Sequence, residues 1–298
     1  MQKIIPHLWF DSQAEEAANF YCGLFDHSNV SYIARYEEAG AEISGMPEGS
    51  VLTVEFTLSG QKFIGLNGGP QFSFTPSISM FVNCETEGEL LRLYRALSQD
   101  GSVLMELGGY PFAQKFVWVQ DKYGLSWQLN LGARSQKITP FLLYSGAQLG
   151  KAEEAVLFYT SLFPDSSVLH MERYGEDEGV PEGTIKHAAF RLAGQEFMAT
   201  ESGMEHAFTF TEAVSLYVDC ENQQEVDRLW DAFTKEGEVQ PCGWVKDKYG
   251  VSWQIVPAAL NDMMKDPDPG KVHNVMKAML QMEKLDLPAL TRAYEQGQ

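Results

Sequence analysis

The sequence predicts an α+β protein built from four βαβββ modules, which form two curved half-barrel sheets with helices outside. Two observations carry this prediction: the chain is one unit written twice, and each copy alternates amphipathic helices with short strand-like runs. DKYGLSWQLN at 121–130 returns as DKYGVSWQIV at 247–256, and further matches follow in the same order. The 298 residues suffice for roughly two domains, each with its own core.

The two copies align from end to end. KIIPHLWF at 3–10 matches KITPFLLY at 137–144, AEEAANFYCGLF at 14–25 matches AEEAVLFYTSLF at 152–163, and FTLSGQKF at 56–63 matches FRLAGQEF at 190–197. Repeat one carries about ten extra residues around 107–115. We therefore expect repeat one over 1–133, repeat two over 137–260 and a C-terminal helical tail over 270–298, with the linker near 132–136.

Each repeat is expected to run strand, helix, three strands, and then the same again. Apolar residues spaced i, i+3, i+4, i+7 predict the helices. They lie at Ala17, Phe20, Tyr21 and Leu24, at Leu90, Leu93, Tyr94 and Leu97, and at the equivalent positions of repeat two. Ser12 and Glu15 suggest a capping box for the first helix. Because one module cannot bury both its sheet and its helix, we expect modules to pair, and each repeat to form an eight-stranded half-barrel pair.

Charge and composition limit the partners. Forty-one Asp and Glu against 22 Lys and Arg give a net charge of -19, which disfavours nucleic acid and anionic membrane surfaces. No signal peptide or run of about 20 apolar residues is found, so we expect a cytoplasmic protein. The four cysteines show no CxxC spacing, which favours buried thiols over disulfides or zinc.

Several motifs resemble those of a known family. AEEAxxFYxxLF, FxLxGQxF, LNGGPxFxF, CGWxKDKYGVSWQIVP and the tail KVHNVMKAMLQMEKLDLPALTRAY are similar to motifs of the PhnB-like branch of the vicinal oxygen chelate superfamily, which includes glyoxalase I and bleomycin-resistance proteins. The resemblance covers nearly the whole chain and implies a tandem vicinal oxygen chelate fold. Such proteins are often labelled 3-demethylubiquinone 3-methyltransferases, but we find no glycine-rich loop suited to S-adenosylmethionine, so methyl transfer is not expected.

The resemblance also implies positions for metal ligands, on the first and last strands of the modules. Imidazole and carboxylate groups bind divalent ions strongly, whereas amide and hydroxyl oxygens are weak metal ligands. Each repeat therefore offers an incomplete set, and the weak candidates for a metal are His7, Gln128 and Glu201. Each implied ligand position of repeat one has an equivalent in repeat two: His7 corresponds to Phe141, Asn67 to Glu201, Ser77 to Ala213, and Gln128 to Gln254.

A small molecule in the cup of the sheets is the expected partner. Strand alternation puts Gln128 on the cup side and Trp127 under the helices, so the repeated DKYGxSWQ motif is expected mainly to build a turn and a closing strand. His187 is expected to be a hydrogen-bonded strand histidine. The candidate ligand-binding residues are His7, Trp9, Asn67, Ser77, Gln128, Glu201, Ser215 and Gln254.

Three functions remain open at this point. The first is a divergent metal-dependent enzyme, and the second is a metal-free protein that binds or sequesters a small molecule. The third is a scaffold whose cup has lost its catalytic activity. It is expected to be a monomer with an internal pseudo-dimer, or a homodimer. The tail is expected to dock on its own domain, with a partner-binding helix as the alternative.

Overall fold

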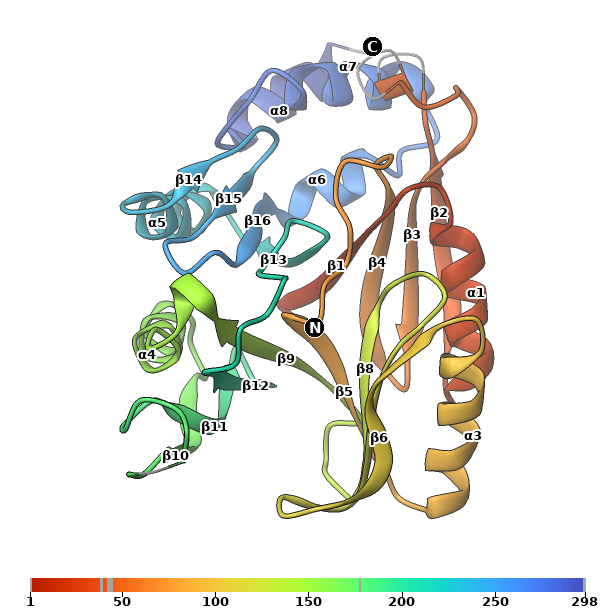
Figure 1. The fold of residues 1–298 in the computed structure, drawn as a ribbon. Coiled ribbons are helices and arrows are strands. Elements are labelled where there is room, and N and C mark those ends of the chain that lie inside the picture. Colours follow the sequence, from red (N-terminus) through yellow and green to blue (C-terminus); the bar gives the residue numbers. More distant parts are fainter. Residues whose placement is uncertain (1, 38–39, 42–44, 177, 297–298) are drawn as a thin grey trace.

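The computed structural model describes residues 2–37, 40–41, 45–176 and 178–296, and these form two eight-stranded sheets with helices packed against them (Figure 1). Sheet A contains, in spatial order, β14 (Glu238–Val239), β15 (Trp244–Lys246), β16 (Ser252–Pro257), β13 (Val214–Cys220), β1 (Ile4–Phe10), β4 (Gln61–Asn67), β3 (Val51–Leu58) and β2 (Asn29–Arg35). Sheet B contains β10 (Ser167–Arg173), β11 (Ile185–Leu192), β12 (Gln195–Ser202), β9 (Ile138–Ser145), β5 (Ile78–Cys84), β8 (Ser126–Leu131), β7 (Ala113–Gln120) and β6 (Ser102–Tyr110).

The helices fall into two groups. Among the described residues, one helix per module packs against its own strands, and three further helices follow the last strand. The first group is α1 (Ala14–Leu24), α3 (Glu87–Ser98), α4 (Ala152–Leu162) and α5 (Gln223–Thr234), and the second is α6 (Ala258–Met263), α7 (Pro269–Met279) and α8 (Leu287–Glu295). A 3₁₀ turn at Gly146–Gln148 precedes α4. The predicted α+β fold of four βαβββ modules is confirmed.

Each sheet joins one module of repeat one to one module of repeat two. We call the pair of strands at which the two repeats meet the seam of each sheet, and both seams are antiparallel. In sheet A, β1 pairs with β13, and His7 lies opposite Ser215. In sheet B, β5 pairs with β9, and Ser79 lies opposite Phe141. The expectation that each repeat forms its own eight-stranded unit is therefore wrong. As a result, His7 and Gln128, which sequence grouped in one repeat, lie on different sheets.

Reciprocal hydrogen bonds between the repeats join sheet A to sheet B. The glutamine of each FxLxGQxF motif follows a tight turn at a glycine with φ 82°, and its side chain reaches the first strand of the other repeat. Gln195 Oε1 accepts from the amide of Ile4, and Gln61 Oε1 accepts from the amide of Ile138, both at 2.9 Å. A motif that is local in the sequence thus joins the two sheets, and with them the two repeats.

The face of each sheet that carries α1, α3, α4 and α5 contributes to one continuous apolar core, in which Trp127 and Trp253 are fully buried. We call the opposite face of each sheet its inner face. In sheet A, the inner face is covered by α6 and the tail: Ile5, Tyr217 and Val256 pack in one apolar cluster with Leu260 of α6 and with Val275, Leu285 and Leu290 of the tail (Figure 1). The tail docks on the chain, as predicted, but it contacts both repeats and not its own domain alone.

An ion pair extends this contact to the far strands of sheet A. Lys265 Nζ, just beyond α6, lies 2.6 Å from Glu55 of β3 and stacks over the ring of Tyr32 of β2. Among the helices that the structure describes, none is long and apolar enough to cross a membrane.

Candidate functional site

The inner face of sheet A gathers three of the predicted site residues. His7 lies opposite Ser215 across the seam, and Gln254 Nε2 donates to Ser215 Oγ at 2.9 Å. The imidazole lies parallel to the ring of Tyr217, with 6.5 Å between centroids, and meets the edge of Trp244 at 5.7 Å. Sequence placed these residues in different repeats, and only the exchange of modules brings them together.

His7 is neutral in this setting. It is 5% exposed, and its Nδ1 has no hydrogen-bond partner among the described residues. Burial without a nearby carboxylate disfavours the charged imidazolium, and this lowers the pKa of His7 to about 3. The unpaired nitrogen is a hydrogen-bonding position on the inner face of sheet A.

On the inner face of sheet B, Phe141 takes the place of His7. It lies opposite Ser79, and Ser79 Oγ accepts from Gln128 Nε2 at 2.8 Å, just as Ser215 does from Gln254. The serine and glutamine pair is therefore repeated, whereas the histidine is not. Ser79 was missed by sequence reasoning, although its alignment with Ser215 could have found it.

A row of rings crosses the inner face of sheet B from one edge strand to the other. Neighbouring ring centroids are 5.4, 5.2, 6.4, 6.0, 6.4 and 5.9 Å apart, within or close to the range for interacting aromatic side chains. In order, the rings are Tyr110, Phe112, Phe116, Phe81, Phe141, His187 and His170. The longer loop predicted near 107–115 supplies the first two rings. No hydrogen bond of the His187 ring is found in the described part of the chain, in contrast to the expectation.

Asn67 and Glu201 lie on the helix-facing side of their sheets. Asn67 Oδ1 accepts from the amide of Ala14 at 2.8 Å, and Glu201 Oε1 accepts from the amide of Ala152 at 3.1 Å, so each caps the start of a helix. The predicted capping box of Ser12 and Glu15 is wrong, because Asn67 and not Ser12 accepts the hydrogen bond at the start of α1. The structure does not bring these two side chains to the inner faces.

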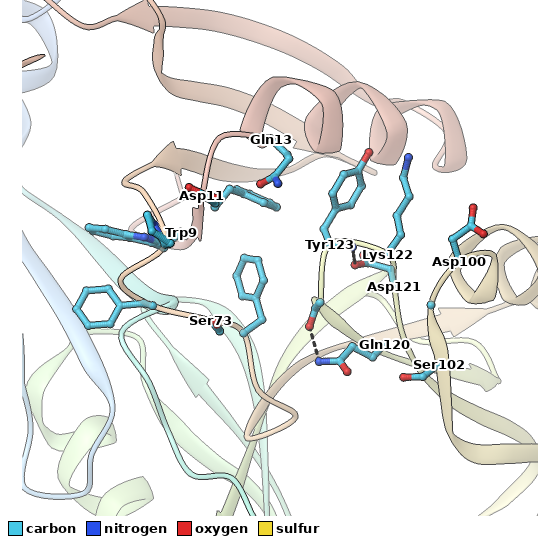
Figure 2. Close-up of a pocket in the computed structure, with 16 residues that line it drawn as sticks. Trp9, Asp11, Gln13, Ser73, Asp100, Ser102, Gln120, Asp121, Lys122 and Tyr123 are labelled. Atoms are coloured by element: carbon cyan, nitrogen blue, oxygen red, sulfur yellow. Dashed lines mark hydrogen bonds between the residues drawn. The ribbon is translucent and has the colours of Figure 1, made fainter. Parts of the chain in front are cut away.

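Two further predicted residues lie elsewhere. Ser77 is fully buried just before β5, and its Oγ has no partner among the described residues. Trp9 donates from Nε1 to the carbonyl of Gly69 at 2.9 Å and contacts the rings of Phe72 and Trp244. Trp9 also lines a cavity of about 570 Å³ at the end of β1 (Figure 2).

The donors on the inner faces do not fit a divalent metal. His7 has Ile64 beside it in register, and Gln254 and Ser215 already hydrogen-bond to each other. On sheet B, Met198 lies beside Phe141, so the corresponding positions offer no imidazole or carboxylate. Within the described ranges, no group of three or more His, Cys, Asp or Glu side chains could hold a metal. A divalent ion needs more charged donors than these faces supply.

The repeated DKYGxSWQ motif builds a turn. In repeat two, Asp247 Oδ2 accepts from Tyr159 Oη at 2.6 Å and Trp253 Nε1 at 2.8 Å, and Oδ1 accepts from the amides of Tyr249 and Val251. Burial raises the pKa of Asp247 to about 6, although these hydrogen bonds oppose the rise. Asp121 accepts the same four bonds in repeat one. The predicted structural role of the motif is confirmed.

The cysteines are also structural. All four are free, and Cys84 and Cys220 are buried in the core. Burial raises the pKa of Cys242, which keeps this thiol protonated at neutral pH. The predicted preference for thiols over disulfides is confirmed.

Two mixed sheets made of four βαβββ modules place this fold in the glyoxalase-like class of the vicinal oxygen chelate superfamily. A family model described as 3-demethylubiquinone-9 3-methyltransferase matches residues 2–130 and again residues 136–256. The chain therefore belongs to this family and contains two copies of the family's domain. It is a tandem-repeat member of the PhnB-like branch.

Solved structures were compared as well. A PhnB protein from Bacillus cereus is 48% identical over 44% of this chain and 100% of its own, with a TM-score of 0.41. Glyoxalase I from Zea mays is 11% identical over 88% of this chain and 96% of its own, with a TM-score of 0.52, which shows a shared fold. A search of curated proteins gave no match.

Proposed function

We propose that this chain binds a small planar aromatic molecule on the inner face of sheet B, without a metal. The row of seven rings carries the proposal, because a planar ligand gains most where it can stack on, or meet edge-on, several rings at once. The half-buried Phe81 stands at the centre of the row, between Phe116 and Phe141.

Sheet B is favoured over sheet A because of the tail. The tail covers Ile5, Tyr217 and Val256 on sheet A. The tail helices make no comparable apolar cluster with sheet B in the described part of the chain. Gln128 and Ser79 supply a few polar atoms beside the rings, and a mostly apolar site with few polar groups is typical of small-molecule binding.

Catalysis through a metal is not proposed, since the inner faces lack the donors for it. Methyl transfer is not proposed either, because the sequence has no glycine-rich loop suited to S-adenosylmethionine. The methyltransferase description belongs to the family as a whole. In this chain, the row of rings supports binding of a planar molecule.

The test is a thermal-shift screen of planar aromatic metabolites and dyes, followed by calorimetry of any compound that raises the melting temperature. Phe81→Leu keeps an apolar side chain but removes the central ring, and we expect it to weaken binding by about three- to tenfold. Phe190→Leu, which removes a ring from the helix-facing side of the same sheet, is the matched control and should leave affinity unchanged. A chelator should have no effect; loss of binding with chelator, or equal affinity in both variants, would contradict the proposal.

A further inference from the structure

A second site is suggested by the cavity of about 570 Å³ at the end of β1 (Figure 2). Figure 2 shows Trp9 and Asp11 on one side of this cavity and Asp100 and Ser102 on the other. The cavity shares no lining residue with the ring row of sheet B, so it is independent of the proposed function. Its size lies within the range of small-molecule pockets.

The internal repeat explains why the cavity lies in repeat one. Residues 11–13 alone connect β1 to α1, whereas residues 146–151 connect β9 to α4 and include the 3₁₀ turn Gly146–Gln148. In repeat two, Gln148 Nε2 lies 3.5 Å from the point where a Cβ on Gly250 would be. The counterpart of Gly250 is Gly124, which lines the cavity. The shorter connection in repeat one thus leaves open a space that repeat two fills.

Aromatic side chains form one part of the cavity wall. Trp9 meets Phe72 edge-on at 4.9 Å, and Phe10 meets Phe74 at 5.1 Å and Tyr123 at 6.2 Å. All five rings line the cavity. Such walls suit an apolar ligand or an organic cation, which is attracted to the negative faces of the rings.

The charges at the cavity decide between these ligands. Lys122 is already matched, because its Nζ lies 2.9 Å from Glu16 and over the ring of Tyr123. Asp121 is buried and accepts four hydrogen bonds, as described above. Asp11 and Asp100 are exposed, and neither forms an ion pair within the described ranges. The uncompensated charge around the rings is therefore negative.

We propose that this cavity binds an organic cation, such as a quaternary ammonium compound, between its aromatic wall and the carboxylates of Asp11 and Asp100. The rings supply cation–π attraction, and the two carboxylates, together with the net charge of -19, favour a cation over a neutral molecule of equal shape. An anion is disfavoured by the same charges.

The first test compares choline with 3,3-dimethylbutan-1-ol, its uncharged carbon analogue, by calorimetry and by the NMR signal of the Trp9 indole N–H. We expect choline to bind at least tenfold more tightly and to shift that signal. The proposal fails if the two compounds bind equally, or if the Trp9 signal does not move on addition of choline.

The second test uses the chain's own repeat. Residues 11–13 are replaced by the seven residues 145–151 of repeat two, which should fill the cavity and lower choline affinity at least tenfold. Binding of an aromatic probe to sheet B should be unchanged in this variant, which separates failure of this site from failure of the proposed function. Unchanged choline affinity in a folded graft overturns the proposal.

Surface variants keep the proposal testable if the graft does not fold. Asp11→Asn combined with Asp100→Asn should weaken choline binding at least fivefold without affecting the melting temperature. Asp26→Asn, an exposed aspartate of the same repeat that does not line the cavity, is the control for general loss of charge. Equal affinities in the double variant and in Asp26→Asn would refute the assignment of the two carboxylates.

Discussion

At the scale of single residues, the two repeats show that a buried polar group is tolerated in two different ways. Asp121 and Asp247 are buried with all their hydrogen bonds made, whereas His7 is buried with Nδ1 unpaired and stays neutral. A charge without partners would be far more costly to bury than a neutral imidazole. The aspartates are therefore part of the architecture, while His7 retains an unused hydrogen-bonding group.

Asp247→Asn should lower the free energy of unfolding by about 1–3 kcal/mol. The amide nitrogen cannot accept a hydrogen bond, so two donors lose their acceptor: either Tyr159 Oη and Trp253 Nε1, or the backbone amides of Tyr249 and Val251. Urea denaturation at neutral pH measures the loss. Asp231→Asn, at an exposed position of α5, should change stability by less than about 0.5 kcal/mol. Similar small changes in both variants would show that the four hydrogen bonds contribute little.

His7 should make the protein acid-sensitive. Its pKa in the folded chain, about 3, lies below the ordinary value of 6.5, so the unfolded chain binds this proton first as pH falls. The stabilising contribution is complete above pH 6.5 and is lost toward pH 3, by up to about 1.4 kcal/mol per pH unit. His7→Phe, which introduces the residue that repeat two carries at Phe141, should remove this component of the pH dependence in urea denaturation at pH 7 and 4.5. His170→Gln, at an exposed histidine, should retain it; parallel pH curves for wild type and His7→Phe would contradict the assignment.

At the scale of elements, the tail is the feature that distinguishes the two sheets. Asp268 and Asp286 cap α7 and α8 by accepting backbone amides, each helix begins with a proline in its first turn, and their apolar faces meet sheet A. Backbone hydrogen bonds from Cys242 and Gly243 to the segment before α8 hold it at 2.7 Å. The tail is thus an integral layer of the structure.

Leu285→Ala should destabilise the protein by about 2–5 kcal/mol, since Leu285 is fully buried and its deletion leaves a cavity against Gly243. Leu157→Ala, at a 51% exposed position of α4, should have an effect below about 0.5 kcal/mol. Denaturant unfolding and limited proteolysis measure the two changes. Rapid cleavage of the tail with unaltered global stability would mean that the tail unfolds independently of the sheets.

At the scale of the whole molecule, the exchange of modules makes the two repeats depend on each other. In each sheet, the two central strands come from different repeats. The segments that lead from one sheet to the other, residues 68–77 and 203–213, also bond to each other. Thr75 Oγ1 donates to the carbonyl of Thr209, and Thr211 Oγ1 donates to the carbonyl of Ser73. The linker near residues 132–136 is therefore not what holds the repeats together.

A protease site inserted at Arg134–Ser135 tests this dependence. After cleavage, the two fragments should elute together in gel filtration at the volume of the intact chain, because the seams β1–β13 and β5–β9 remain paired. Denaturant at a concentration that unfolds the intact protein should separate them. Two fragments that separate in buffer would show that the seams contribute little and that the covalent linker is required.

The sequence by itself determined the duplication, the order of elements and, apart from Asn67 and Glu201, which residues pack under the helices, because these depend on local periodicity and on direct comparison of the repeats. The turn at Asp121 and Asp247, the docked tail and the free cysteines follow from the same local signals. Inner-face residues such as His7 and Gln128 were also predicted from strand alternation.

Only the tertiary structure decided which of these residues meet. The pairing of β1 with β13 joins His7 to Ser215 and Gln254, and the pairing of β5 with β9 joins Phe141 to Phe81. Within one chain, pairing inside a repeat and pairing between repeats use the same strand patterns, so no local signal separates them. The two pairings differ only in long-range contacts, such as the bonds of Gln61 and Gln195 that join the two sheets in this arrangement.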